Sequence, residues 1–294
     1  MQSHDHNFKN LFLDFPSEAL TWLLPEVLRE YGELRHIEFV RQEPGKRKLT
    51  DRGLELDMPI LFTFDAGQIL LWLVEFQEDK RKFSIYRLLR YVTDLMERYP
   101  LATVIPTVLF TERRRWKKDV SRQLLSRFGE RVFLHFEFQL IRLFDYQARD
   151  YYNTANPLLK ILLPKMDFKE EDRLEVIRQA YKGLYELVAP MVFDKYLDFI
   201  DIYAGIAEDE KETIYCDLRE HKETAMLAQY IKSKGFEEGM RQGRHGLLER
   251  ILVSRFGILP DWARRKLDSA SPEQLEQWAD CVLKAESIRD ILSE

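Results

Sequence analysis

The first 150 residues combine two kinds of apolar spacing, and each kind predicts a different secondary structure. Apolar residues recur every three or four positions where a helix is expected, and at alternate positions or in short runs where a strand is expected. This pattern predicts helices over 8–30, 83–99 and 114–128, and strands over 34–42, 54–64, 68–76, 102–110 and 132–141. Turn-forming residues make 43–53 a basic loop. The sequence therefore predicts a mixed α/β domain over 1–150.

The strand pattern disappears after residue 150. Residues 151–234 predict a helical extension with breaks near Pro164, Pro190 and Gly205. Four glycines then fall almost one helical turn apart within 235–246, and each weakens a helix by about 1 kcal/mol relative to alanine. We interpret 235–246 as a linker or frayed helix, with a close helix–helix contact as the alternative. Residues 247–294 predict a small helical domain, in which Ser271 and Pro272 begin a helix.

Composition narrows the class of protein. The chain is 45% hydrophobic, which is typical of a folded protein. Its length of 294 residues suggests two domains. Cys216 and Cys281 lie too far apart for a CxxC motif and are too few for a secreted disulfide framework. The longest apolar run, 69–74, has six residues, whereas a membrane-spanning helix needs about 20. We therefore expect a cytoplasmic protein without a membrane span.

Charge is distributed unevenly along the chain. Residues 1–150 hold 24 Lys and Arg against 23 Asp and Glu, whereas 151–294 hold 21 against 27. The local excess of positive charge is at 111–131, with eight basic and three acidic residues. Such a stretch suits a phosphate-rich partner, although a solvated helix face is the alternative. Within it Trp116, Val120 and Leu124 recur at helical spacing, so Trp116 is expected to pack in the core.

The second and third predicted strands carry the most informative acidic residues. If Ala66 is the centre of the loop between them, opposing residues have numbers that sum to 132, as Asp57 and Glu75 do. The same register places Glu55 opposite Gln77. Residues two apart in a strand share a face, and opposed side chains have Cβ atoms about 4.5–5.5 Å apart. Three carboxylates and one amide are therefore expected to gather on one face of the sheet.

Acidic side chains in this position need a compensating cation. Their neighbours along both strands are strongly apolar, which predicts a buried hairpin, and buried carboxylates must be paired, protonated or bound to metal. A hard divalent cation such as Mg²⁺ prefers oxygen ligands of this kind. Two alternatives stay open. Either the register of the hairpin is shifted by one or two residues, or a basic side chain from Lys80, Lys82 or Arg87 neutralises the acids.

Several short motifs resemble those of a known family. Asp57, followed by Glu75-Phe76-Gln77 on the next strand and then by a helix, looks like the core of the PD-(D/E)XK nuclease superfamily. HDHNFKNLF at 4–12 and VEFQ at 74–77 are similar to motifs of its recombination-promoting nuclease or transposase (Rpn, YhgA-like) family, as are Arg87 and Tyr91. The glycine repeat at 235–243 and the helical tail after RFGILP also resemble bacterial members. The resemblance covers about 1–145 and 235–294.

This resemblance implies a fold and an activity. The fold is a PD-(D/E)XK, restriction-endonuclease-like core with a central mixed sheet flanked by helices, followed by an all-α half. The activity is metal-dependent DNA cleavage connected with recombination or mobile elements. Low sequence specificity is expected, because no helix-turn-helix or zinc-finger pattern is evident. The alternative is an inactive nuclease-fold scaffold for protein–protein interaction, and the sequence also permits a homodimer.

The resemblance also assigns roles to individual residues. Asp57 and Glu75 would hold Mg²⁺, with Mn²⁺ as a substitute, and Gln77 would complete the catalytic set at the position of the superfamily's lysine. Glu55 and Glu18 are candidate additional acids. The candidate contacts to DNA phosphates are Arg87, Arg113, Arg114, Lys117 and Lys118. Glutamine can only hydrogen-bond, so its presence leaves metal binding in place but puts the reaction rate in question.

Overall fold

A computed structural model of the chain describes residues 4–40, 59–112, 116–222, 224–282 and 285–292. These residues form two compact units, Met1–Glu208 and Asp209–Glu294, which we describe separately. The first unit holds a mixed sheet and the second is helical, as the sequence predicts. No helix in the described part of the chain has the length and apolar character needed to cross a membrane.

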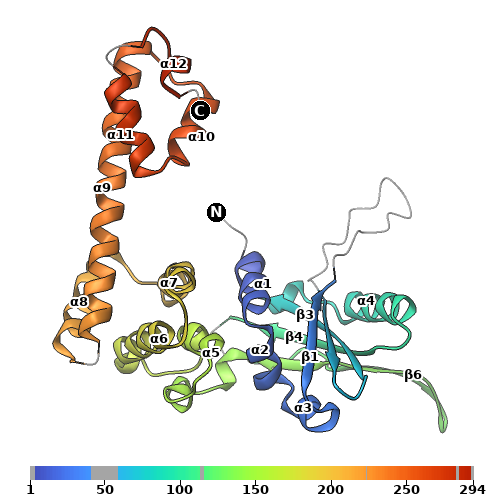
Figure 1. Ribbon diagram of the computed structural model, residues 1–294. Coiled ribbons are helices and arrows are strands. Elements are labelled where there is room, and N and C mark those ends of the chain that lie inside the picture. Colours follow the sequence, from blue (N-terminus) through green and yellow to red (C-terminus); the bar gives the residue numbers. More distant parts are fainter. Residues whose placement is uncertain (1–3, 41–58, 113–115, 223, 283–284, 293–294) are drawn as a thin grey trace. The chain divides into compact units, whose positions relative to one another are not determined.

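A five-stranded mixed sheet forms the centre of the first unit (Figure 1). Its order is β1-β2-β3-β4-β7, and the strands are β1 (Leu34–Phe39), β2 (Ile60–Phe64), β3 (Ile69–Gln77), β4 (Thr103–Phe110) and β7 (Gln139–Arg142). The β1–β2 and β2–β3 pairs are antiparallel, whereas β3–β4 and β4–β7 are parallel. Strand β3 is therefore central and takes part in both kinds of pairing.

The register of the β2–β3 hairpin agrees with the sequence prediction. Ile60 pairs with Trp72 and Thr63 with Ile69, so opposing numbers sum to 132. The connecting turn ends at Gly67, whose φ of +87° is a conformation that glycine adopts at low cost. The ladder between β1 and β2 continues to Pro59, whose carbonyl accepts a 3.0 Å hydrogen bond from Val40. The pairs between β2 and β3 therefore confirm the predicted register for the described part of the hairpin.

Helices cover the two faces of the sheet. One face of β3 packs against the N-terminal helices α1 (His4–Asp14) and α2 (Pro16–Leu23), and α3 (Pro25–Tyr31) leads into β1. The Phe12 ring of α1 lies 5.9 Å from Trp72 and 4.9 Å from Phe76, measured between ring centroids. The other face packs against α4 (Ile85–Arg98), where Leu71 and Leu73 share a core with Leu88. Alternation along β3 thus sends even-numbered side chains towards α1 and odd-numbered ones towards α4.

The predicted helix over 114–128 is wrong for the described residues. Residues 116–122 have no helix, and the chain then forms β5 (Gln123–Phe128) and β6 (Arg131–Glu137), an antiparallel two-stranded ribbon. Gly129, with φ +56°, makes the turn between the strands instead of ending a helix. The helical spacing of Trp116, Val120 and Leu124 has another cause, because these side chains pack against the sheet core from an irregular segment and a strand.

The predicted strand over 132–141 is two strands. It is divided at Phe138 into β6, which pairs only with β5 in the described chain, and β7, which joins the main sheet. The short 3₁₀ segments η1 (Lys80–Lys82) and η2 (Leu143–Asp145) follow β3 and β7.

The rest of the first unit is helical, with breaks where the sequence predicts them. It contains η3 (Ala148–Tyr151), α5 (Pro157–Leu162), η4 (Leu163–Lys165), η5 (Glu170–Asp172), α6 (Arg173–Leu187) and α7 (Pro190–Ala204). Pro164 lies in η4, Pro190 begins α7, and Gly205 ends it in a left-handed conformation. The predicted helical extension is confirmed as helical.

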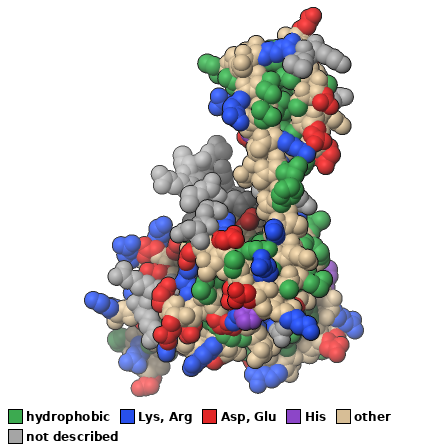
Figure 2. Space-filling view, turned by 90° about the vertical axis from the view of Figure 1, so that its left-hand side faces the viewer, with side chains coloured by type: hydrophobic (Ala, Val, Ile, Leu, Met, Phe, Trp, Pro, Cys, Tyr) green, Lys and Arg blue, Asp and Glu red, His purple; other side chains and the backbone are tan. Residues whose placement is uncertain are grey.

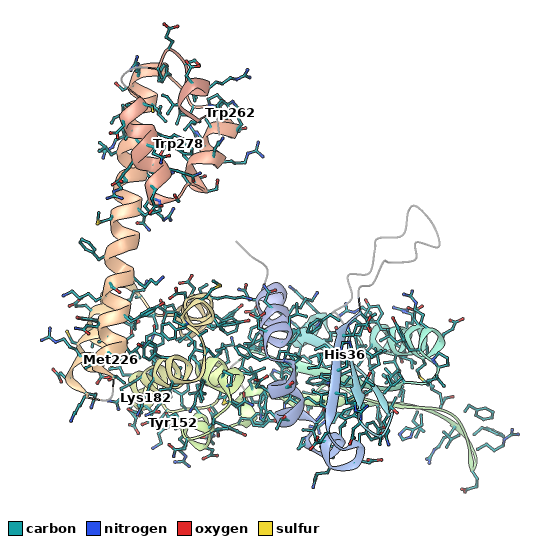
Figure 3. All side chains as sticks on the ribbon, in the orientation of Figure 1. His36, Tyr152, Lys182, Met226, Trp262 and Trp278 are labelled. Carbon is teal, nitrogen blue, oxygen red and sulfur yellow. The ribbon has the colours of Figure 1, made fainter. Side chains whose placement is uncertain are left out.

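The second unit consists of α8 (Glu208–Glu220), α9 (Ala225–Phe256), α10 (Asp261–Asp268), α11 (Pro272–Cys281) and α12 (Ile288–Leu292). Residues 235–246 belong to the single helix α9 and not to a linker. No atom lies within 4 Å of a Cβ placed on Gly235, Gly239 or Gly243, so these glycines make no close helix contact in the described chain. Trp278 packs in the core of α9–α12 (Figure 3), and Ser271 forms the expected cap.

Candidate functional site

Glu75 is a buried carboxylate in the middle of the mixed sheet. It lies near the carboxyl end of β3, level with Val108 of β4, and its exposure is 6%. Alternation places it on the same side of β3 as Leu73 and Gln77, facing the layer formed by α4. The apolar residues around it make β3 a stable central strand, and this burial makes an unneutralised carboxylate costly.

Two polar side chains from the described residues contact the Glu75 carboxylate. The Gln77 Nε2 amide donates a 2.7 Å hydrogen bond to Glu75 Oε1. Arg87 Nη2 donates to the same oxygen and forms an ion pair. Arg87 comes from the first turn of α4, which the Ser84 side chain caps through the Arg87 main-chain N–H. The structure therefore brings together Glu75, Gln77 and Arg87, three of the predicted site residues.

The Arg87 contact bears on one of the alternatives that the sequence left open. A basic side chain does neutralise Glu75, and it is Arg87 that does so. The guanidinium side chain is 30% exposed while the carboxylate side chain is 7% exposed, so Arg87 connects the buried acid to the surface. Its predicted contact with a DNA phosphate stays a prediction.

Of the remaining candidate acids, Glu18 alone lies in the described part of the chain. Glu55 and Asp57 lie outside the described residues, as do Arg113 and Arg114. Glu18 is on α2, whose Leu23 carbonyl accepts a hydrogen bond from Gln139. Its side chain makes no hydrogen bond or ion pair with the described residues. Across the described ranges, no three His, Cys, Asp or Glu side chains are grouped as metal ligands.

Lys117 and Lys118 are exposed on the segment between β4 and β5. The Lys80 ammonium donates a 2.6 Å hydrogen bond to the Lys118 carbonyl and lies 4.9 Å from the centroid of the Trp116 ring. Trp116 packs edge-on against Phe110, with centroids 4.6 Å apart, which confirms its predicted place in the core. Both lysines are thus held on an ordered segment at the surface.

Asp119 holds this segment to the sheet, although no sequence pattern indicated this residue. Its carboxylate accepts 2.9 Å bonds from Arg122 and from Arg142 of β7. Burial raises the pKa of Asp119, but the hydrogen bond from Arg122 and the charge of Arg142 outweigh this and hold it below its usual 3.8. Asp119 and Arg142 are 23 residues apart, so no local pattern could have indicated their pairing.

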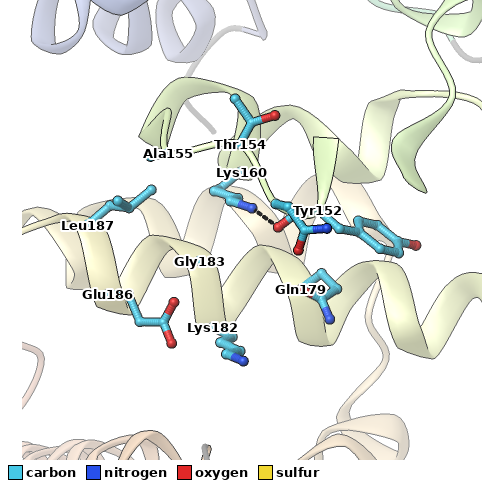
Figure 4. Close-up of a pocket in the computed structure, with 10 residues that line it drawn as sticks. Tyr152, Thr154, Ala155, Lys160, Gln179, Lys182, Gly183, Glu186 and Leu187 are labelled. Carbon is cyan, nitrogen blue, oxygen red and sulfur yellow. Dashed lines mark hydrogen bonds between the residues drawn. The ribbon is translucent and has the colours of Figure 1, made fainter. Parts of the chain in front are cut away.

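A separate cavity of about 260 Å³ lies between the segment 152–155 and α6 (Figure 4). Its wall includes Lys160, whose ammonium donates to the main-chain carbonyls of Tyr151, at 3.1 Å, and Tyr152. Burial lowers the pKa of Lys160. The stem of this lysine packs over Gly183, where an added Cβ would clash with Lys160 Cδ. These contacts give Lys160 a role in joining η3 to α6.

A comparison with protein families shows to which family the chain belongs. Residues 2–191 match the model of a family described as "Putative transposase, YhgA-like". The chain belongs to this family. The match to the YhgA-like family runs beyond 145, so it includes α5 and α6 as well as the sheet. The family description indicates an enzyme that acts on DNA. No curated protein and no solved structure matches the chain.

Proposed function

We propose that this YhgA-like protein is a Mg²⁺-dependent DNA endonuclease of low sequence specificity, connected with recombination or mobile elements. The observation that carries the proposal is the buried Glu75 of β3, contacted by Gln77 and reached from solvent by Arg87. It lies in a chain whose family is described as transposases. The order of helices, three antiparallel strands, helix and parallel strand supports a PD-(D/E)XK core.

The donor set fits a hard cation. Continuing the observed β2–β3 register, in which opposing numbers sum to 132, would bring Asp57 opposite Glu75 and Glu55 opposite Gln77. Carboxylate and amide oxygens are the ligands that Mg²⁺ and Mn²⁺ accept, often with only one or two carboxylates from the protein. Asp57 and Glu75 would hold the ion and Glu55 would be an additional acid, whereas Glu18 lies on α2, which packs on the other face of β3 from Glu75.

The chain's own side chains would divide the remaining work. A bound Mg²⁺ would supply charge to polarise the scissile phosphate and to activate a water molecule. Gln77 orients the Glu75 carboxylate through its amide and replaces the superfamily's lysine without its charge. Arg87 would bind a phosphate oxygen when its contact with Glu75 is relaxed. Lys117 and Lys118, with Arg113 and Arg114, would contact the DNA backbone.

One observation favours the alternative of an inactive, nuclease-fold scaffold that binds other proteins. Arg87 already neutralises Glu75, so the buried acid is stable without a metal ion. Combined with glutamine at position 77, this arrangement would suit a fold that has kept its site as structure only. The two functions differ in whether divalent metal binds and supports cleavage.

Plasmid nicking tests the proposal. Purified wild type is incubated with supercoiled plasmid in Mg²⁺, in Mn²⁺ and in EDTA, beside Asp57→Ala and Glu75→Ala. We expect nicking with either metal, none in EDTA, and a loss of at least about 100-fold in both variants, because each removes a ligand. Equal nicking by all three proteins would reveal a contaminant. No nicking by folded wild type would favour the scaffold.

A further inference from the structure

The β5–β6 ribbon extends from the main sheet (Figure 1). Apolar side chains are exposed along it. Only its base is covered, where Phe136 is buried and Leu124 packs on the sheet core. Beyond the base five apolar residues are exposed, namely Phe128 (81%), Phe133 (63%), Val132 (58%), Leu125 (51%) and Leu134 (39%). Several exposed apolar side chains on one small element are typical of an interaction site in a folded protein.

Both faces of the ribbon carry this apolar surface. Neighbouring positions of a strand point to opposite faces, so Phe133 lies on one face while Val132 and Leu134 lie on the other. Leu125 pairs with His135, on the face of Phe133, and Ser126 pairs with Leu134. Neither strand pairs with another strand of the described chain, so the ribbon also has two bare edges. A partner that covered one face alone would leave the other exposed to water.

We propose that this ribbon is the interface through which two copies of the chain form a symmetric dimer. A second ribbon of the same shape, coiled around the first, would cover both faces, and two-stranded ribbons have the strong twist that such coiling requires. The five exposed residues amount to roughly 550 Å² per copy at about 150–210 Å² for each fully exposed residue. Two copies would bury about 1,100 Å², close to the lower limit of about 1,200 Å² for a specific interface.

The charges near the tip complement a second copy. Arg127 and Arg131 flank Phe128 and Gly129, and Glu130 lies between them in the turn. In an antiparallel, two-fold arrangement the tip of one ribbon lies along the base of the other, so Arg127 and Arg131 face the exposed Glu137 of the second copy, and the same contact repeats on the opposite side. The ribbon's acids and arginines nearly balance, which suits a protein partner better than a polyanion.

The position of the ribbon also favours a protein partner over DNA. β7 runs parallel to β3 and β4, with Gln139 level with Thr107, and β6 precedes it towards the opposite end of the sheet from Gln77. At about 3.3 Å per residue the tip lies roughly 30 Å along the strands from the level of Glu75. A dimer formed through the ribbons therefore leaves the Glu75 end of each sheet open. The interface does not depend on the proposed nuclease activity.

Sedimentation of the full chain tests the proposal. Wild type is compared with the double variant Phe128→Ser/Phe133→Ser, and with Leu101→Ser as a control that removes an equally exposed apolar side chain elsewhere. We expect wild type and Leu101→Ser to sediment as a dimer of about 70 kDa, twice the 35.2 kDa chain. The double variant should be a monomer or dissociate at least about 100-fold more readily, and an unchanged circular dichroism spectrum would show that it is folded.

Three outcomes would overturn it. Wild type that stays monomeric at high micromolar concentration has no such interface, and this result needs no folded variant. A dimer that survives the double substitution is formed by another surface. A monomeric wild type whose DNA binding is abolished by the ribbon substitutions, but not by Leu101→Ser, would make the ribbon a DNA-binding arm instead.

Discussion

Glu75 is a buried carboxylate whose charge is balanced by a guanidinium, and the consequences can be tested one residue at a time. In Arg87→Met the carboxylate keeps its burial but loses this cation. We expect the free energy of unfolding in metal-free buffer to fall by about 2 kcal/mol, since a buried ion pair broken on one side leaves an uncompensated charge. Mn²⁺ should recover part of the loss by replacing the cation.

Urea unfolding with and without Mn²⁺ measures both effects. Arg90→Met is the matched control, because Arg90 is an exposed residue on the same helix whose side chain has no ion pair in the described chain. A similar loss of stability in both variants would deny that the Glu75 contact matters. A loss in Arg87→Met that Mn²⁺ leaves unchanged would count against a metal site at Glu75.

Contacts could be predicted from the sequence where the two residues lie close together along one strand. Glu75 and Gln77 are two apart on one strand, so their shared face followed from alternation alone. The choice of Arg87 over Lys80 and Lys82 as the cation did not follow, because it depends on how α4 begins relative to the sheet. Lys80 instead bonds the Lys118 carbonyl, 38 residues away.

At the scale of elements, two helical glycines have opposite surroundings. Gly183 of α6 has the Lys160 side chain packed over it, whereas nothing lies within 4 Å of a Cβ on Gly235 of α9. Alanine favours a helix by about 1 kcal/mol over glycine, so Gly235→Ala should stabilise the protein by up to that amount. Gly183→Ala should instead destabilise it by about 1–3 kcal/mol, because the added methyl overpacks the site.

Chemical unfolding followed by circular dichroism separates the two glycines. Adding Lys160→Ala to Gly183→Ala should reduce the cost of the methyl group, since the crowding stem is then gone. Stabilisation by Gly183→Ala in the wild-type background would refute the packing of Lys160 over this helix.

Asp119 holds the segment 116–122 to Arg142 of β7, and this attachment depends on pH. Its pKa in the folded protein is held below 3.8, so its contribution to stability is present above that pH and is lost as the pH falls through the folded-state pKa. The carboxylate is partly exposed, and about 0.5 kcal/mol is therefore expected from its ion pairs. Asp119→Asn should be less stable than wild type at pH 7, and the difference should shrink at pH 3. Urea midpoints at both values measure it, and a constant difference would contradict the assignment.

The elements themselves show why part of the fold could be predicted. The β2–β3 hairpin has a short turn with a glycine and strongly apolar flanks, so its register followed from loop length. Strand β5 was predicted as part of a helix because Arg-Gln-Leu-Leu-Ser-Arg-Phe suits either structure by composition, whereas the segment of β6 was predicted as a strand. Pairing with β6, which is not a local property, decides for the strand.

For the whole molecule, the negative net charge argues against DNA binding by overall electrostatic attraction. The chain carries −5, and acidic and basic side chains are interspersed on the face that Figure 2 shows. DNA binding must therefore depend on local contacts. We expect Lys117→Ala/Lys118→Ala to reduce the slope of log affinity against log salt by about 2, since each phosphate contact contributes about 0.9.

A fluorescence titration of labelled duplex at several salt concentrations measures this slope. Arg149→Ala/Lys169→Ala removes the same charge from exposed positions elsewhere in the first unit and should leave the slope nearly unchanged. Equal effects of the two double variants would show that the segment 116–122 has no special part in binding DNA.

Metal binding is the most direct test of the account, because it requires no knowledge of the DNA substrate. Calorimetry compares Mn²⁺ and Mg²⁺ titrated into wild type, Glu75→Gln and Asp57→Asn, each of which keeps the shape of the side chain and removes its charge. We expect one ion per chain in wild type and at least about 10-fold weaker binding in both variants. Wild type that binds neither ion, or variants that bind as tightly as wild type, would contradict it.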